Sequence, residues 1–116
     1  MKVGKLLARG MVIGATVAAL TGAIASHVWA DGAKDVFDDK CSGCHGPSGK
    51  GDGPAGKMLQ PPPQDFATAL KGKSDADIAK IIKEGGGAVG KSPNMPPASD
   101  LTDDQVKSLV AYIKHL

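Results

Sequence analysis

The chain has 116 residues, and its 14 basic and 12 acidic residues give a formal net charge of +2 at pH 7. A chain of this length accommodates one small domain. Its charges are dispersed without a continuous basic run, which argues against nucleic acid as a partner, because phosphate binding needs a concentrated positive face.

The first thirty residues have the pattern of a secretory signal peptide. Three basic residues precede an uncharged apolar run, and Ala30 ends a small-residue cleavage pattern, with Ala25 as a second candidate. The alternative is an uncleaved N-terminal membrane anchor, although the run barely reaches the ~20 apolar residues that span a bilayer. We therefore predict a signal peptide over 1–30, a domain over 31–116, a periplasmic location after cleavage, and membrane contact only if the leader stays uncleaved.

The predicted mature domain is nearly neutral and poor in bulky apolar side chains. It retains 11 basic and 12 acidic residues, and its aromatic residues are Phe37, Phe66 and Tyr112. So small a core calls for an added stabilising element such as a disulfide, a metal or a large cofactor.

Two helices are predicted in the first part of the domain. The first covers 33–41, with Val36 and Phe37 among charged residues. In the second, Asp65 caps a brief helical turn that extends through Leu70.

Two clearer helices follow. In the stretch 74–84, Ser74 or Asp75 caps a helix with isoleucines at i, i+3 and i+4, and Gly85 ends it. For the last helix, Thr102 and Gln105 form a capping box. One apolar stripe then contains Val106, Leu109, Val110 and Ile113. No stretch alternates apolar and polar residues as a strand does. The sequence therefore predicts an all-α fold of three to five short helices with Gly- and Pro-rich loops.

The segment Cys41-Ser42-Gly43-Cys44-His45 contains both cysteines of the chain. C-x-x-C-H is the attachment pattern of c-type haem. Two thioether bonds at this spacing tether one porphyrin edge, and the adjacent histidine supplies the proximal nitrogen to the iron. We therefore predict one covalently bound haem c on Cys41 and Cys44, with His45 as an iron ligand.

Three other interpretations of the cysteines are open. A disulfide oxidoreductase uses C-x-x-C within a βαβ unit, and no strand is predicted here. A zinc site needs four ligands, and beyond the motif only the distant His115 is available as a Cys or His ligand. A structural disulfide across so short a loop stabilises little.

The region 33–116 resembles the class I c-type cytochromes, the small monohaem electron carriers of the bacterial periplasm. Phe37 lies four residues before the first haem cysteine, as an aromatic residue does in that family, and Leu109 and Tyr112 match its L-x-x-Y pattern in the last helix. Ala33 stands where the family usually has glycine. The resemblance implies the cytochrome c fold, with the first and last helices packed together.

The resemblance also assigns roles in the haem environment. Pro54 matches the proline whose carbonyl accepts the proximal histidine proton. Leu59 and Phe66, in a segment similar to the family's P-x-D-F, are expected to contact the porphyrin.

The sixth ligand of a haem iron held by one histidine is predicted to be Met95. A thioether favours reduced iron, and Met95 lies in a loop stiffened by three prolines, in an M-P sequence like that of the family's distal methionine. Met58 is the alternative, although packing or contact with the haem edge is its more ordinary role.

The stretch 85–92, "GGGAVGKS", matches the phosphate-loop pattern G-x-x-x-x-G-K-[ST]. A phosphate loop follows a strand and opens a helix, whereas this stretch follows a predicted helix and leads into prolines. We therefore expect no nucleotide; the loop instead delivers Met95.

These features predict a periplasmic electron-transfer protein, not an enzyme, that cycles one His/Met-ligated haem between Fe(III) and Fe(II). Its partners would be redox proteins that act as donor and acceptor. Two alternatives are a small cytochrome subunit of a larger oxidoreductase complex and a haem-based binder of small ligands with a labile Met95.

Overall fold

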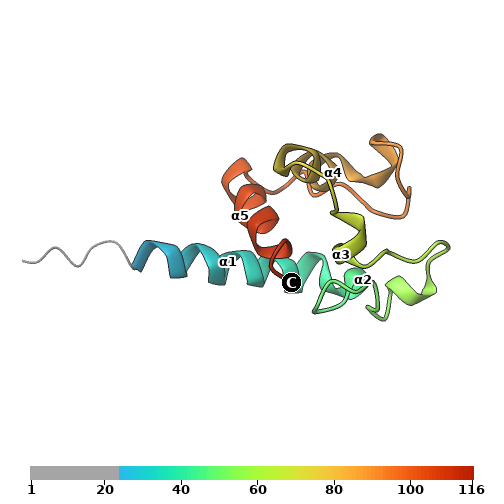
Figure 1. The fold of residues 1–116 in the computed structure, drawn as a ribbon, viewed down its shortest axis with the longest axis horizontal. Coiled ribbons are helices and arrows are strands. Elements are labelled where there is room, and N and C mark those ends of the chain that lie inside the picture. Colours follow the sequence, from blue (N-terminus) through green and yellow to red (C-terminus); the bar gives the residue numbers. More distant parts are fainter. Residues whose placement is uncertain (1–23) are drawn as a thin grey trace, which may run out of the picture.

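The structure is a computed structural model that describes residues 24–116, with side chains from Gly32 onward. Most of the predicted signal peptide lies outside the described residues. The elements are α1 (Ile24–Lys40), α2 (Ser42–His45), the 3-10 helix η1 (Gly56–Met58), α3 (Phe66–Ala69), α4 (Asp75–Ala88) and α5 (Asp103–Ile113). No strand occurs within 24–116, so the all-α prediction is confirmed for this part of the chain. Helix α5 packs on α1 and on α4. In Figure 1, α3 is drawn between α4 and α2.

Helix α1 begins earlier than predicted. It was expected over 33–41 and instead starts at Ile24. The stretch contains no proline, and Gly32 costs a helix interior only about 1 kcal/mol, so no residue there stops the helix. None of the helices within the described residues is long and apolar enough to cross a membrane.

The predicted caps of the three later helices are confirmed. Asp65 accepts a hydrogen bond from the Ala67 N–H at 2.8 Å at the start of α3. A capping box of Ser74 and Asp77 opens α4, and Thr102 and Gln105 form the expected box on α5. Two short helices, α2 and η1, were not predicted, because three or four residues show no apolar period.

Helix α4 is interrupted at Gly85, the residue at which the sequence predicted its end. Gly85 has φ +81° and ψ 165°, outside the helical region, and one further turn follows it up to Ala88. This combination of angles is essentially restricted to glycine. Gly85 therefore ends the first part of α4, as predicted, but the chain resumes a helical turn before the loop.

The core lies where α1, α4 and α5 meet. It consists of Phe37, Ile78, Ile82, Leu101, Val106, Leu109, Val110 and Ile113. The predicted apolar stripe of α5 is buried in full. Exposed ion pairs Lys83–Asp103 (2.6 Å) and Lys114–Asp75 (2.5 Å) join α4 to α5, and pairs that water can screen contribute little to stability.

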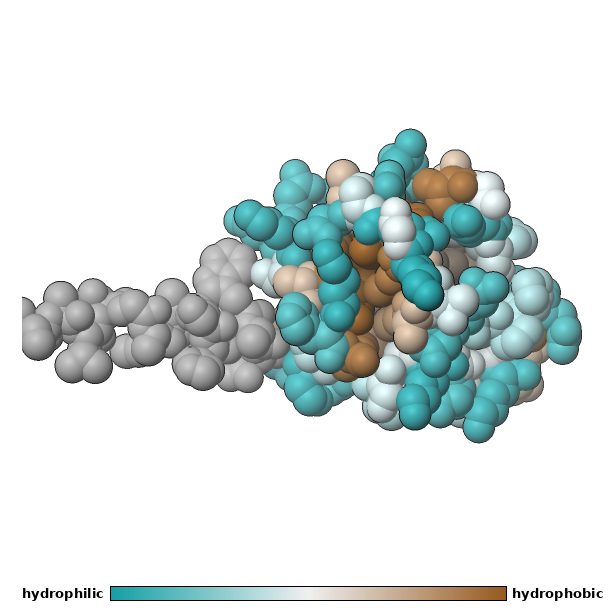
Figure 2. Space-filling view, in the orientation of Figure 1, coloured by the Kyte–Doolittle hydropathy of each residue, from teal (hydrophilic) through white to brown (hydrophobic). Residues whose placement is uncertain are grey.

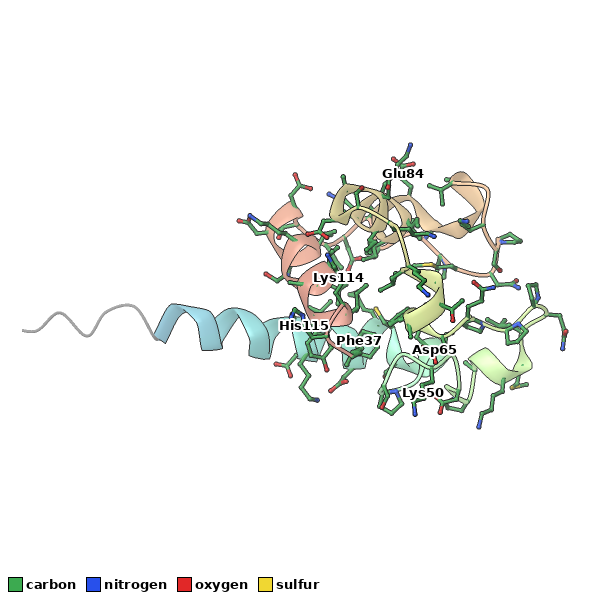
Figure 3. All side chains as sticks on the ribbon, viewed as in Figure 1. Phe37, Lys50, Asp65, Glu84, Lys114 and His115 are labelled. Carbon is green, nitrogen blue, oxygen red and sulfur yellow. The ribbon has the colours of Figure 1, made fainter. Side chains whose placement is uncertain are left out.

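Phe37 occupies the crossing of α1 and α5 (Figure 3), and its side chain is fully buried. Its ring centroid lies 5.5 Å from that of Tyr112 and 6.2 Å from that of Phe66. Ala33 is also buried, at 4% exposure, one turn earlier on α1. The predicted packing of the first helix on the last is thus present, although Tyr112 is only partly buried.

We expect Phe37→Ala to lower the free energy of unfolding of the holoprotein by ~3–5 kcal/mol, because it empties a fully enclosed site. Tyr112→Ala should cost less, about 1–3 kcal/mol, because that ring is partly exposed. Denaturant unfolding of both single variants and the double variant should give a coupling energy of about 0.5 kcal/mol or more, as for contacting residues. Strictly additive effects would contradict the contact.

Candidate haem site

A cavity of about 660 Å³ opens between α1, α3, α4, α5 and the loops that follow α2 and α4. Figure 2 shows hydrophobic side chains in a recess of the surface, with hydrophilic residues around it. The apolar lining includes Leu70, Ile78, Ile81, Leu109 and Ile113. A volume in the range of roughly 300–1,000 Å³ with mostly apolar walls is typical of a cofactor site.

The C-x-x-C-H segment forms a compact turn at one wall of this cavity. The Cys41 N–H donates to the Phe37 carbonyl at 2.9 Å, which continues α1 by one residue, and the His45 N–H donates to the Cys41 carbonyl at 2.9 Å. Cys41, Cys44 and His45 all line the cavity. The end of α1 and the turn that follows it therefore hold the two cysteines and the histidine close together.

His45 has the properties of a metal ligand. Burial lowers its pKa, which favours the neutral imidazole that binds metals. Its Nδ1 is buried without a hydrogen-bond partner, the one such side-chain nitrogen or oxygen within the part of the chain that the structure describes. The Phe66 ring lies 4.8 Å from the imidazole, centroid to centroid, and helps to hold its plane.

The alternatives for the cysteines lose support. Burial raises the pKa of the Cys41 thiol to about 11, whereas thiol–disulfide exchange depends on a lowered pKa that yields thiolate. No group of three or more His, Cys, Asp or Glu within 24–116 is arranged to hold a metal ion. His115 is exposed on α5's C-terminal side, where its Nδ1 contacts the Ala111 carbonyl at 2.7 Å.

Met95 lines the same cavity as the C-x-x-C-H turn and packs partly buried against the core. Met58 lies outside the cavity lining and is 84% exposed. The interpretation of Met58 as a packing residue is therefore wrong: η1 ends there, and its side chain faces solvent.

Of the three residues predicted to surround the haem, two line the cavity and one does not. Leu59 and Phe66 line the cavity, whereas Pro54 is exposed and does not. The predicted hydrogen bond from the His45 ring to the Pro54 carbonyl is not formed, since Nδ1 has no partner. Gly53 packs directly on the carbonyls of residues 42 and 43, and the next residue, Pro54, is exposed.

Sequence reasoning missed a set of polar residues at the cavity. Lys40, Gln64, Lys73, Lys91, Asn94 and Asp100 contribute to the lining. Lys40 pairs with Asp100 at 2.7 Å. No sequence signal distinguished these lysines, because lysines are spread along the domain from Lys34 to Lys114.

These residues fit a covalently attached haem. The cavity supplies two thiols, a neutral imidazole with an unpartnered nitrogen, a thioether, apolar walls for a porphyrin and polar side chains for its acidic substituents. In c-type cytochromes two cysteines attach the porphyrin, and a histidine and a methionine hold the iron.

Comparisons with known proteins agree with this geometry. A family model described as Cytochrome c matches residues 30–116. Cytochrome c-554(547) of Halothiobacillus neapolitanus is 30% identical over 83 residues, which are 72% of this chain and 91% of that protein. The Cbb3-type cytochrome c oxidase subunit CcoP of Azospirillum brasilense is 32% identical over 88 residues, which are 75% of this chain but 28% of that protein. No solved structure matches significantly.

Proposed function

The chain belongs to the cytochrome c family, and from this premise we propose that it is a periplasmic electron carrier with one haem per chain. Cys41 and Cys44 would hold the haem covalently, and His45 and Met95 would be its axial ligands. When bound, the haem supplies an iron that exchanges one electron between Fe(III) and Fe(II).

The protein's own residues would bind, orient and enclose that group. The turn after α1 fixes both thiols and the imidazole, the apolar side chains of α4 and α5 exclude water, and the loop after α4 brings a thioether to the same cavity. If His45 and Met95 both bind the iron, no coordination position would remain for a substrate, which supports a carrier without turnover.

One observation carries the proposal. Met95 and the C-x-x-C-H turn, fifty residues apart in sequence, line a single cavity, whereas Met58 lies outside it. With Met95 and His45 both bound to it, the iron would be favoured in its reduced state, which suits electron transfer.

A redox titration of the purified holoprotein, followed through the haem absorption bands, tests this function. We expect a reversible one-electron transition in which both oxidation states stay low-spin, and no binding of carbon monoxide by the reduced protein. Carbon monoxide binding at neutral pH would instead favour the second candidate class, a small-ligand binder with a labile Met95.

Similarity to an oxidase subunit supports one further candidate, a cytochrome subunit of a larger oxidoreductase complex. Fractionation of native cells separates the two cases. A cleaved free carrier would be recovered from the soluble periplasmic fraction, whereas a subunit would be extracted from membranes with its complex.

A further inference from the structure

The loop that carries Met95 rests on the backbone of α4's last turns. The Gly86 N–H donates to the Met95 carbonyl at 3.0 Å, and the Lys91 N–H donates to the Gly86 carbonyl at 2.7 Å. The Ala98 N–H donates to the Ile82 carbonyl at 2.9 Å. Three backbone hydrogen bonds therefore tie the loop to the end of α4, on both sides of Met95.

The approach is so close that Gly86 has no room for a side chain. A Cβ there would lie 2.2 Å from the Ser92 carbonyl oxygen and 3.1 Å from the Met95 Cβ. At Gly85 it would lie 2.9 Å from both the Met95 oxygen and the Pro97 nitrogen, at a φ of +81°. Both glycines are buried. The loop can take its present path only because these two residues lack a Cβ.

The Ser92 carbonyl links this contact to Met95. It accepts a hydrogen bond from the Met95 N–H at 3.3 Å, which closes the turn that presents the methionine. Any group that displaces the Ser92 oxygen must therefore also move the Met95 backbone. Ligand groups have to be held within roughly 0.5 Å of their productive position, so such a shift would weaken an axial bond.

We propose that Gly85 and Gly86, here called the glycine pair, are positioning residues for the Met95 sulfur, and that Gly86 determines how firmly the sulfur occupies the sixth coordination position. This inference rests on the proposed role of Met95 as an iron ligand. The glycine-rich stretch that imitates a phosphate loop thus has a role in the haem site.

Gly87 provides the matched control. It is the next residue in the same turn, and it is exposed. A Cβ at Gly87 would lie 3.5 Å from the Pro93 Cα and 3.7 Å from the Pro93 Cβ, which is ordinary van der Waals contact. Gly86→Ala and Gly87→Ala make the same chemical change in one helical turn, and only the first disturbs the Met95 loop.

Titration of the ferric holoprotein with imidazole, which competes with the thioether for iron, tests the proposal. For Gly86→Ala we expect an imidazole Kd lower by about tenfold or more, and loss of the near-infrared band of the methionine-ligated ferric haem; for Gly87→Ala the Kd should stay within about twofold of wild type. If Met95→Ala abolishes the band but Gly86→Ala keeps the wild-type band and Kd, the glycine pair has no positioning role. If Met95→Ala keeps the band, the ligand assignment itself is overturned, and the proposal with it.

A measurement on the wild-type protein covers the case in which Gly86→Ala yields no holoprotein. Saturating imidazole, confirmed by loss of the near-infrared band, should accelerate hydrogen exchange of the Gly86 amide by about tenfold or more, because the Met95 carbonyl that it contacts is released. The Val110 amide in α5 should be unaffected. Unchanged exchange of the Gly86 amide would overturn the proposal.

Discussion

Replacement of Cys41 and Cys44 together by alanine is expected to leave no haem on the polypeptide after acid–acetone extraction and to yield little folded protein. Without thioether bonds nothing holds the group covalently in the cavity of about 660 Å³. A domain this small buries too little apolar surface to stay folded around an empty cavity of this size. Haem content and far-UV circular dichroism of the variant check both parts of the prediction.

Ser42→Ala is the control for this variant. Ser42 lies between the two cysteines, and its hydroxyl donates to the Asp38 carbonyl at 2.8 Å on the surface of the turn. Its loss should leave covalent haem at the wild-type level. Haem that resists extraction from the double cysteine variant would show that the attachment lies elsewhere.

Met95→Ala is expected to open one axial position of the iron. The ferric spectrum should change from low-spin towards a mixed or high-spin form, the near-infrared band should disappear, and the reduced protein should bind carbon monoxide. The reduction potential should fall by on the order of 0.1 V, a fraction of the roughly 0.8 V over which axial ligands tune haem, because the thioether favours Fe(II). Absorption spectroscopy and potentiometry measure these changes.

Met58→Ala serves as the methionine control. Because the Met58 side chain is 84% exposed, we expect its removal to change neither the spectrum nor the free energy of unfolding appreciably. Loss of the near-infrared band in Met58→Ala, with retention in Met95→Ala, would reverse the ligand assignment. If both variants keep the wild-type spectrum and the reduced Met95→Ala protein binds no carbon monoxide, the assignment of Met95 as ligand is overturned.

Local chemistry made several elements predictable from the sequence. The Ser74 cap of α4 and the capping box of α5 depend on residues within three positions of each other, and both formed as expected. The apolar stripe of α5 repeats at the helical period and is buried. The C-x-x-C-H motif is likewise contained within one turn, so its placement on a single cavity wall follows from its spacing.

Features that depend on distant contacts were not predictable in this way. Pro54 and Met58 fit local patterns, but the packing of Gly53 and η1 against α2 leaves both exposed. Gly86 was identified only as part of an apparent phosphate loop, because its close approach to Ser92 exists only once the chain has folded back over α4. The early start of α1 shows that a change in composition near residue 31 does not end a helix that lacks a stop signal.

The mass of the tryptic peptide 41–50 tests the central claim most directly. Trypsin cuts after Lys40 and Lys50, so this peptide contains Cys41, Cys44 and His45 and no other candidate attachment residue. We predict that the peptide from the purified protein carries the mass of one haem joined through two thioether bonds. A peptide with the mass of the bare polypeptide would contradict the account.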